Sequence, residues 1–252
     1  MCTVSFLRLK QGYSLMMNRD ESPLRPAPET LAQPVLDGPS GPRRVLYPVD
    51  PSSQGTWVGM SERGASFCLL NQHPQGWKRR PGLQSRGRLL PLALAADTAI
   101  AGLERVAGED LSATAPFLLV GVDETQAPLS LIWDGQALER RLHVEGPGLW
   151  TSSAFQPQAV DQARQAQYQR CLAGLPLDVD DAGLLAAQEA FHYSEEPEPG
   201  PVAVWMTRSD ARTVSYTHVL MVPKQGLLRY LDREAKEMGQ SALVVAIARP
   251  IP

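Results

Sequence analysis

The first 21 residues, MCTVSFLRLKQGYSLMMNRDE, decide the fold that this sequence can adopt. Residues 2–9 alternate loosely between apolar and polar side chains, which is the period of a β-strand. A short turn ending in glycine reverses the chain, and residues 13–18 continue as a partner strand. A hairpin with this spacing brings Cys2 beside Arg19 and Asp20 at its open end.

Cys2 directly follows the initiator methionine. Removal of Met1, which is usual before a small residue, would leave a free α-amine and a thiol on one residue. Their unperturbed pKa values are about 8 and about 8.5, so this residue would hold both a nucleophile and a candidate general base. A guanidinium such as that of Arg19 would lower the thiol pKa. A carboxylate such as Asp20 could hold the amine or the arginine in place.

The remaining pattern predicts strands at the start, middle and end of the chain, separated by helices. Eight prolines place most of residues 22–53 in a loop. The expected strands are 55–61 and 65–71 (a second hairpin), 117–122, 129–133 and 136–144 (a meander), 202–206, 213–222, 227–231 and 242–248. The expected helices are 86–107 (its second part capped by Asp97 or Thr98), 160–175, and 182–190 (capped by Asp180). Because no βαβ alternation is present, this order favours an α+β fold of antiparallel sheets with helices outside, in one domain over residues 1–252.

Composition excludes several classes of protein. The chain has 252 residues, 43% of them hydrophobic, and a formal net charge of −3, which is typical of a soluble globular protein and not of a nucleic-acid binder. A local basic cluster is either a solvated loop or an anion contact; it comprises Lys78, Arg79, Arg80, Arg86 and Arg88. No signal peptide and no membrane span are expected. Three widely spaced cysteines suit the cytoplasm, and no cofactor is implied. The four histidines lack ligand spacing, so no metal site is expected.

Six short segments, in order along the chain, together resemble the NRDE family, which is the family of the transport and Golgi organization protein 2. They are Met1-Cys2, Met17-Asn18-Arg19-Asp20-Glu21, Gly55-Thr56-Trp57-Val58-Gly59, Leu69-Leu70-Asn71, Ser85-Arg86-Gly87-Arg88 and Arg212-Thr213-Val214-Ser215. The resemblance implies membership of the N-terminal nucleophile hydrolase superfamily, close to the cysteine group of penicillin V acylases and bile-salt hydrolases. It also implies a four-layer αββα sandwich of antiparallel sheets covered by helices.

The resemblance also assigns expected catalytic roles. Cys2 would be the nucleophile, Arg19 would lie against the thiolate, and Asp20 would orient or charge-balance the α-amine. Asn71 would donate to the oxyanion, a contact whose loss typically costs about 10²–10³ in rate. Arg212 would be the second arginine of the site, with Arg208 as the alternative.

Three further residues are candidates for substrate binding. Asn18 belongs to the motif itself. Trp57 either lines the pocket or packs in the core. Ser153 stands where related sequences tend to have asparagine; its hydroxyl can still donate, but it is shorter and differently aimed.

Two functions follow from these expectations. The first is hydrolysis of a linear amide of a small acylated substrate through a thioester on Cys2, with the α-amine shuttling the proton. The second is non-catalytic binding or carriage of a hydrophobic ligand, lipid or haem, on the same scaffold, which Ser153 favours. The expected partner is therefore a small-molecule substrate or hydrophobic ligand, and assembly into a homo-oligomer is left open.

Overall fold

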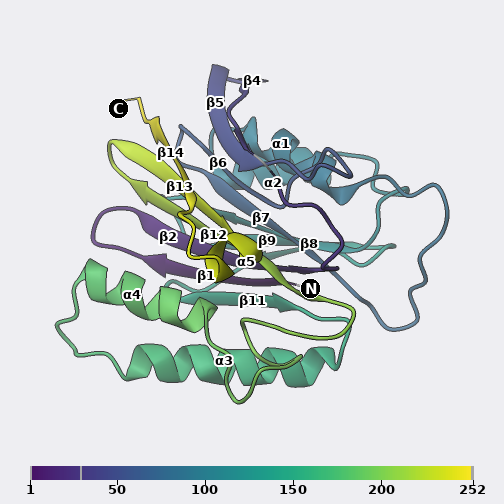
Figure 1. Cartoon of the computed structure of the whole chain (residues 1–252). Coiled ribbons are helices and arrows are strands. Elements are labelled where there is room, and N and C mark those ends of the chain that lie inside the picture. Colours follow the sequence, from purple (N-terminus) through teal and green to yellow (C-terminus); the bar gives the residue numbers. More distant parts are fainter. Residues whose placement is uncertain (1, 29, 251–252) are drawn as a thin grey trace.

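The structure, a computed structural model, describes residues 2–28 and 30–250. Within this part of the chain, two antiparallel sheets pack face to face (Figure 1). The first sheet has six strands in the order β11-β1-β2-β12-β13-β14. Their bounds are β1 Cys2–Arg8, β2 Tyr13–Glu21, β11 Gly148–Ser152, β12 Arg212–Val222, β13 Gln225–Asp232 and β14 Leu243–Ala248.

The second sheet is formed by strands from the middle of the chain. It follows the order β10-β9-β8-β7-β6-β5-β3, with β4 pairing β5 off this path. The bounds are β3 Leu31–Ala32, β4 Val35–Gly38, β5 Gly41–Pro48, β6 Val58–Ser61, β7 Ser66–Asn71, β8 Phe117–Val122, β9 Leu129–Trp133 and β10 Leu138–Leu142.

Helices cover the outer face of each sheet, as Figure 1 shows. Helices α1 (Leu89–Leu94) and α2 (Ala99–Ala107), preceded by the 3₁₀ turn η1 (Arg86–Arg88), lie over the second sheet. Helices α3 (Pro157–Ala173) and α4 (Asp181–His192) lie over the first, and the short α5 (Arg233–Glu237) follows β13. The layers are therefore α, β, β and α, as expected. None of the described helices is long and apolar enough to cross a membrane.

The alternation in β1 and β2 sorts their side chains between two buried environments. Val4, Phe6, Leu15 and Met17 pack in the core between the two sheets. The alternate positions, which include Ser5, face α3 and α4 and are also buried. The alternation is loose because both faces of this hairpin are covered, so its polar residues form buried hydrogen bonds instead of facing water.

Most of the expected elements are confirmed. Both hairpins, the meander, the helices, and the last three strands occur within a few residues of their expected bounds. The side chains of Thr98 and Asp180 cap α2 and α4 by accepting from backbone amides.

Three expectations differ from the structure. Residues 22–53 hold β3, β4 and β5, because their prolines lie in connections and at strand positions that the ladder tolerates. Residues 202–206 form no strand, since side chains instead of a neighbouring strand bind the carbonyls of Val202, Ala203 and Val204. Strand β11 was not predicted; it is short and pairs with β1.

Candidate active site

Cys2 is the first residue of β1 and lies between two neighbouring strands. It stands opposite Arg19 of β2 and opposite Ser152 of β11. Directly opposed residues in an antiparallel pair point to the same face of the sheet, so Cys2, Arg19 and Ser152 share the face that meets the second sheet. The hairpin thus brings the thiol and the guanidinium together, as predicted.

The Cys2 thiol is buried and its environment contains opposing influences. Burial raises the pKa of the thiol above its ordinary value, and the charge of Asp20 adds to this. The backbone amide of Asp20, which donates to the sulfur, and the guanidinium of Arg19 both lower it. The thiolate is therefore costly to form at this buried position, yet one backbone donor and one positive charge stabilise it.

Arg19 is held by Asp50 and Trp57. Its Nη2 lies 2.5 Å from Oδ2 of Asp50, and its guanidinium lies 4.0 Å from the centre of the Trp57 ring. The same carboxylate oxygen accepts from Nε of Arg25 at 2.7 Å. Burial alone would raise the pKa of Asp50, but the hydrogen bonds from Arg25 and Ser53 and the charge of Arg19 hold it below its usual value. Asp50 thus stays ionised and anchors the arginine.

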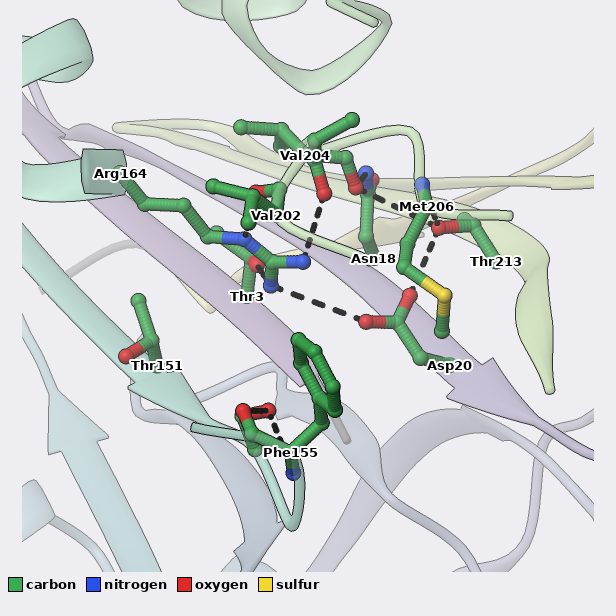
Figure 2. Close-up of polar contacts among 12 residues, drawn as sticks. Thr3, Asn18, Asp20, Thr151, Phe155, Arg164, Val202, Val204, Met206 and Thr213 are labelled. Carbon is green, nitrogen blue, oxygen red and sulfur yellow. Dashed lines mark hydrogen bonds and ion pairs between the residues drawn. The ribbon is translucent and has the colours of Figure 1, made fainter. Parts of the chain in front are cut away.

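Asp20 follows Arg19 on β2 and therefore points to the opposite face of the sheet, where Figure 2 shows it facing Arg164 of α3. Its Oδ1 accepts from the hydroxyl of Thr213 at 2.7 Å, and its Oδ2 lies 3.7 Å from Nη1 of Arg164. Arg164 also donates to Thr3 at 2.5 Å and to the carbonyls of Val202 and Ala203. Asp20 is therefore a buried carboxylate held at the back of the nucleophile strand.

A pocket of about 540 Å³ opens on Cys2. Five of the predicted site residues line it: Cys2, Arg19, Asp20, Trp57 and Asn71. Asn71 ends β7 in the second sheet, and its side-chain amide makes no hydrogen bond within the described part of the chain. The pocket therefore contains a thiol, a guanidinium and a free amide donor, which is a set of groups suited to acyl transfer.

The other predicted residues lie outside this pocket. Arg212 binds Glu234 at 2.9 Å and lines a neighbouring cavity of about 170 Å³, which shares Arg19 and Arg25 with the main pocket. Asn18 is fully buried under α4, where it donates to the carbonyl of His192 at 2.7 Å. Arg208 binds Asp210 at 2.6 Å. The structure does not bring these three side chains to Cys2.

Ser153 lies beside the pocket and not within it. Its hydroxyl donates to the carbonyl of Phe155 at 2.5 Å and accepts from the amide of the same residue at 3.1 Å. It lines a small cavity of about 100 Å³ that shares Asn71 with the main pocket. The hydroxyl is thus engaged in a local turn.

Two residues of this region were not predicted. Asp50 lies in the segment expected to be loop, and Arg164 lies on a helix whose sequence is mostly polar. Arg164 falls on the same helical face as Val160 and Tyr168, and this spacing could have singled it out, since a buried charge needs partners. Asp50 carried no comparable signal.

The family model of Transport and Golgi organisation 2 matches residues 1–169, which is more than half of the chain. The chain belongs to the Transport and Golgi organisation 2 family. No curated protein matches its sequence.

Solved structures share the fold of this family member at low sequence identity. Penicillin V acylase from Agrobacterium tumefaciens matches with a TM-score of 0.57 and 11% identity, over 98% of this chain and 86% of the other. The N-acylethanolamine-hydrolyzing acid amidase ortholog of Caenorhabditis elegans gives 0.56 and 13%, over 97% and 100%. The C2A mutant of conjugated bile acid hydrolase from Clostridium perfringens gives 0.53 and 14%, over 98% and 92%. The chain therefore has the αββα fold of N-terminal nucleophile hydrolases.

Proposed function

We propose that this member of the Transport and Golgi organisation 2 family is a cysteine N-terminal nucleophile hydrolase that cleaves a linear amide of a small acylated substrate. One observation carries the proposal: Cys2, Arg19 and Asn71, from both sheets, line a single pocket. The fold supports it, because solved acylases and amidases share that fold. A bile acid hydrolase has been solved with the cysteine at its own second position replaced.

In the proposed first step, Cys2 forms the bond to the substrate. The mechanism requires loss of Met1, a residue that lies outside the described ones. The new α-amine takes the thiol proton, and the thiolate attacks the amide carbon. The negative charge that develops on the carbonyl oxygen receives a hydrogen bond from Asn71. Arg19 stabilises the thiolate, and Asp20, near the end of the neighbouring strand β2, balances the charge of the protonated amine.

In the second step the intermediate collapses. The C–N bond breaks, and the ammonium of Cys2 gives its proton to the departing amine, leaving a thioester on the sulfur. Water then attacks the thioester, the C–S bond breaks, and a carboxylic acid leaves with the thiol restored. Each step conserves protons and electrons, and no cofactor enters. Three free cysteines fit a reducing compartment, so we keep the cytoplasm as the expected location.

A carrier of a hydrophobic ligand, lipid or haem, is the alternative. It is favoured by the positions of Ser153 and Arg212, because neither side chain reaches the pocket. The many charged side chains that line the pocket weigh against an apolar ligand.

Intact mass spectrometry separates the two functions. The purified protein is treated with a panel of small amides and activated esters, and its mass is followed with time. The hydrolase predicts loss of Met1 and a transient acyl adduct on Cys2. The adduct and turnover should disappear in Cys2→Ala and persist in Cys171→Ala, which removes a half-buried thiol elsewhere. Retention of Met1 would contradict the hydrolase, and ligand retention by Cys2→Ala without any acylation would favour the carrier.

A further inference from the structure

The arginines of the pocket fall into two groups. Arg19 and Arg25 share Asp50, and Arg25 also binds Glu21 at 3.0 Å. Asp50 and Glu21 therefore neutralise these two arginines, which lie near and just after the end of β2. Together with Asp20, which is held on the other face of the sheet, they are the acidic residues that line the pocket.

Arg79 and Arg86 form the second group and lack carboxylate partners. Arg86 is half-buried, and its Nη1 donates to the carbonyl of Pro116 at 2.9 Å. Arg79 is exposed and makes neither an ion pair nor a hydrogen bond with the described residues. Both line the same pocket as Cys2. The pocket thus contains two positive charges that form no ion pair with a described residue.

Arg79 and Arg86 line the same pocket as the thiol, and their charges act on each other. Burial lowers the pKa of Arg86, and the charges of Arg79 and Arg25 add to the lowering, whereas the negative charges of the Cys2 thiolate and of Glu21 oppose it. Two guanidinium groups that line one partly closed pocket repel one another. A bound anion would relieve that repulsion and form charge-assisted hydrogen bonds with both.

A close backbone approach fixes Arg86 at the pocket wall. A side chain on Gly87 would place its Cβ 2.7 Å from the amide nitrogen of Thr56, and one on Gly55 would lie 2.9 Å from Cα of Gly87. The amide of Thr56 in turn donates to the carbonyl of Gly87 at 3.3 Å. Only glycine allows the two segments to cross at this distance, so the segment that contains Arg86 is held against the start of β6.

We propose that the substrate of this site carries an anionic group of carboxylate size, which Arg79 and Arg86 bind while the scissile carbonyl lies at Cys2. The proposal rests on the hydrolase function and specifies its substrate class. A guanidinium is planar and offers paired donors that match a carboxylate. A pocket of about 540 Å³ is of a size suited to a small molecule that spans both groups. The basic cluster seen in the sequence is then, in part, an anion contact.

Alkylation of Cys2 by two reagents of nearly equal size tests the charge preference without any turnover. Iodoacetate is anionic and iodoacetamide is neutral, and both transfer a small group to a thiolate with loss of iodide. The rate of each is measured at Cys2 by peptide mass, and the ratio of the two is compared with that for glutathione in the same buffer. A change in the thiol pKa cancels in this ratio, because both reagents need the same thiolate.

The ratio is expected to favour iodoacetate at Cys2 relative to glutathione. Arg79→Gln and Arg86→Gln should each lower it by about tenfold, the size of one charge-assisted contact. Arg80→Gln is the matched control: the same charge is lost one residue away, from a side chain that lies outside the pocket and binds the carbonyl of Ser112. Added salt should weaken the preference in the parent protein. Arg86→Lys, which keeps the charge, should retain most of it.

An unchanged ratio in Arg79→Gln and Arg86→Gln would overturn the proposal. Arg79 is exposed and unpartnered, so its variant provides the result even where Arg86→Gln does not fold. Reaction of Cys2 with neither reagent would also overturn it, because no substrate carbonyl could then reach the thiol. If only the proposed hydrolase function were wrong, the result would differ. Cys2 would still prefer iodoacetate, but the protein would turn over no amide.

Discussion

Asp50 and Arg19 form a buried ion pair of 2.5 Å, and through it a residue before β6 sets the position of the guanidinium opposite Cys2. Asp50 itself is fixed by the backbone amides of Ser52 and Ser53, each 2.9 Å from Oδ1. The arginine that stabilises the thiolate therefore depends on the turn at Asp50, which connects β5 and β6 of the second sheet. The first prediction follows from this pair.

Asp50→Asn should destabilise the protein by about 3 kcal/mol, because it leaves Arg19 buried without its counter-charge. Urea unfolding measures this change. Glu62→Gln is the control: it breaks the more exposed pair with Arg44 and should cost at most about 1 kcal/mol. Equal losses in the two variants would show that the Arg19 pair is no more than a surface contact.

Arg164→Lys should cost about 2–4 kcal/mol although it keeps the positive charge. Arg164 donates to Thr3 and to two carbonyls at once, and a lysine cannot reproduce the fork of a guanidinium, so buried acceptors lose their partners. Arg170→Lys on the exposed side of the same helix should change stability by less than about 0.5 kcal/mol. Urea unfolding of the two variants and the parent protein gives both values. Indistinguishable unfolding midpoints for the two variants would contradict the prediction.

Stability should fall as the pH falls from about 6.5 toward 4. Burial lowers the pKa of His192 to about 3, with the charges of His218 and Arg164 adding to the effect, and burial lowers that of His218 to about 4, with Arg229 adding. In the unfolded chain both titrate near 6.5. In this pH window the unfolded state therefore binds protons that the folded state does not bind. The contribution of the two histidines to the free energy of unfolding is complete above about pH 6.5 and is lost as the pH falls below it.

Each of the two histidines should contribute a slope of up to about 1.4 kcal/mol per pH unit in this window. Urea unfolding between pH 7 and pH 4 measures the sum. His218→Gln should reduce the slope by removing one titrating group, and its amide can still reach Ser14, which His218 contacts at 3.0 Å. A free energy of unfolding that stays flat from pH 7 to pH 4.5 in the parent protein would rule this account out.

Gly87→Ala should cost about 1–3 kcal/mol, because its Cβ would fall 2.7 Å from backbone and not from a flexible side chain. The two segments would have to separate, which moves Arg86. The preference of Cys2 for iodoacetate should therefore fall together with stability. Gly200→Ala, whose Cβ would meet nothing closer than 3.9 Å, should change neither, and a Gly87→Ala protein with full stability would show that the crossing tolerates a methyl group.

The sequence predicted the part of the site that local spacing controls. A hairpin joins Cys2 to Arg19 within 20 residues, so its register follows from the alternation of two strands. Asn71 was found because the resemblance placed it. Neither Asp50 nor Arg164 was predicted, since each acts through a contact between segments far apart in the chain. The strand expected at 202–206 was wrong for the same reason: Arg164 and Asn18, which bind its carbonyls, are distant in sequence.

Arg212 shows the limit of a motif. It begins β12 opposite Glu21, so the register places its backbone close to the site. Its side chain, however, binds Glu234 on α5 and lines the other cavity. A motif match gives the strand position of a residue, whereas the direction of a long side chain depends on which charges surround it.

The two sheets contribute different things to the pocket. The first supplies Cys2 and Arg19, whose strands are held from behind by directional hydrogen bonds to α3 and α4. The second sheet and the segment after it supply Trp57, Asn71 and Arg86. The reacting groups thus stand on both sheets, whereas the proposed anion-binding arginines stand only on the segment after β7. The segment after β7 can change in sequence, and with it the choice of substrate, while the strand that presents the nucleophile keeps its place.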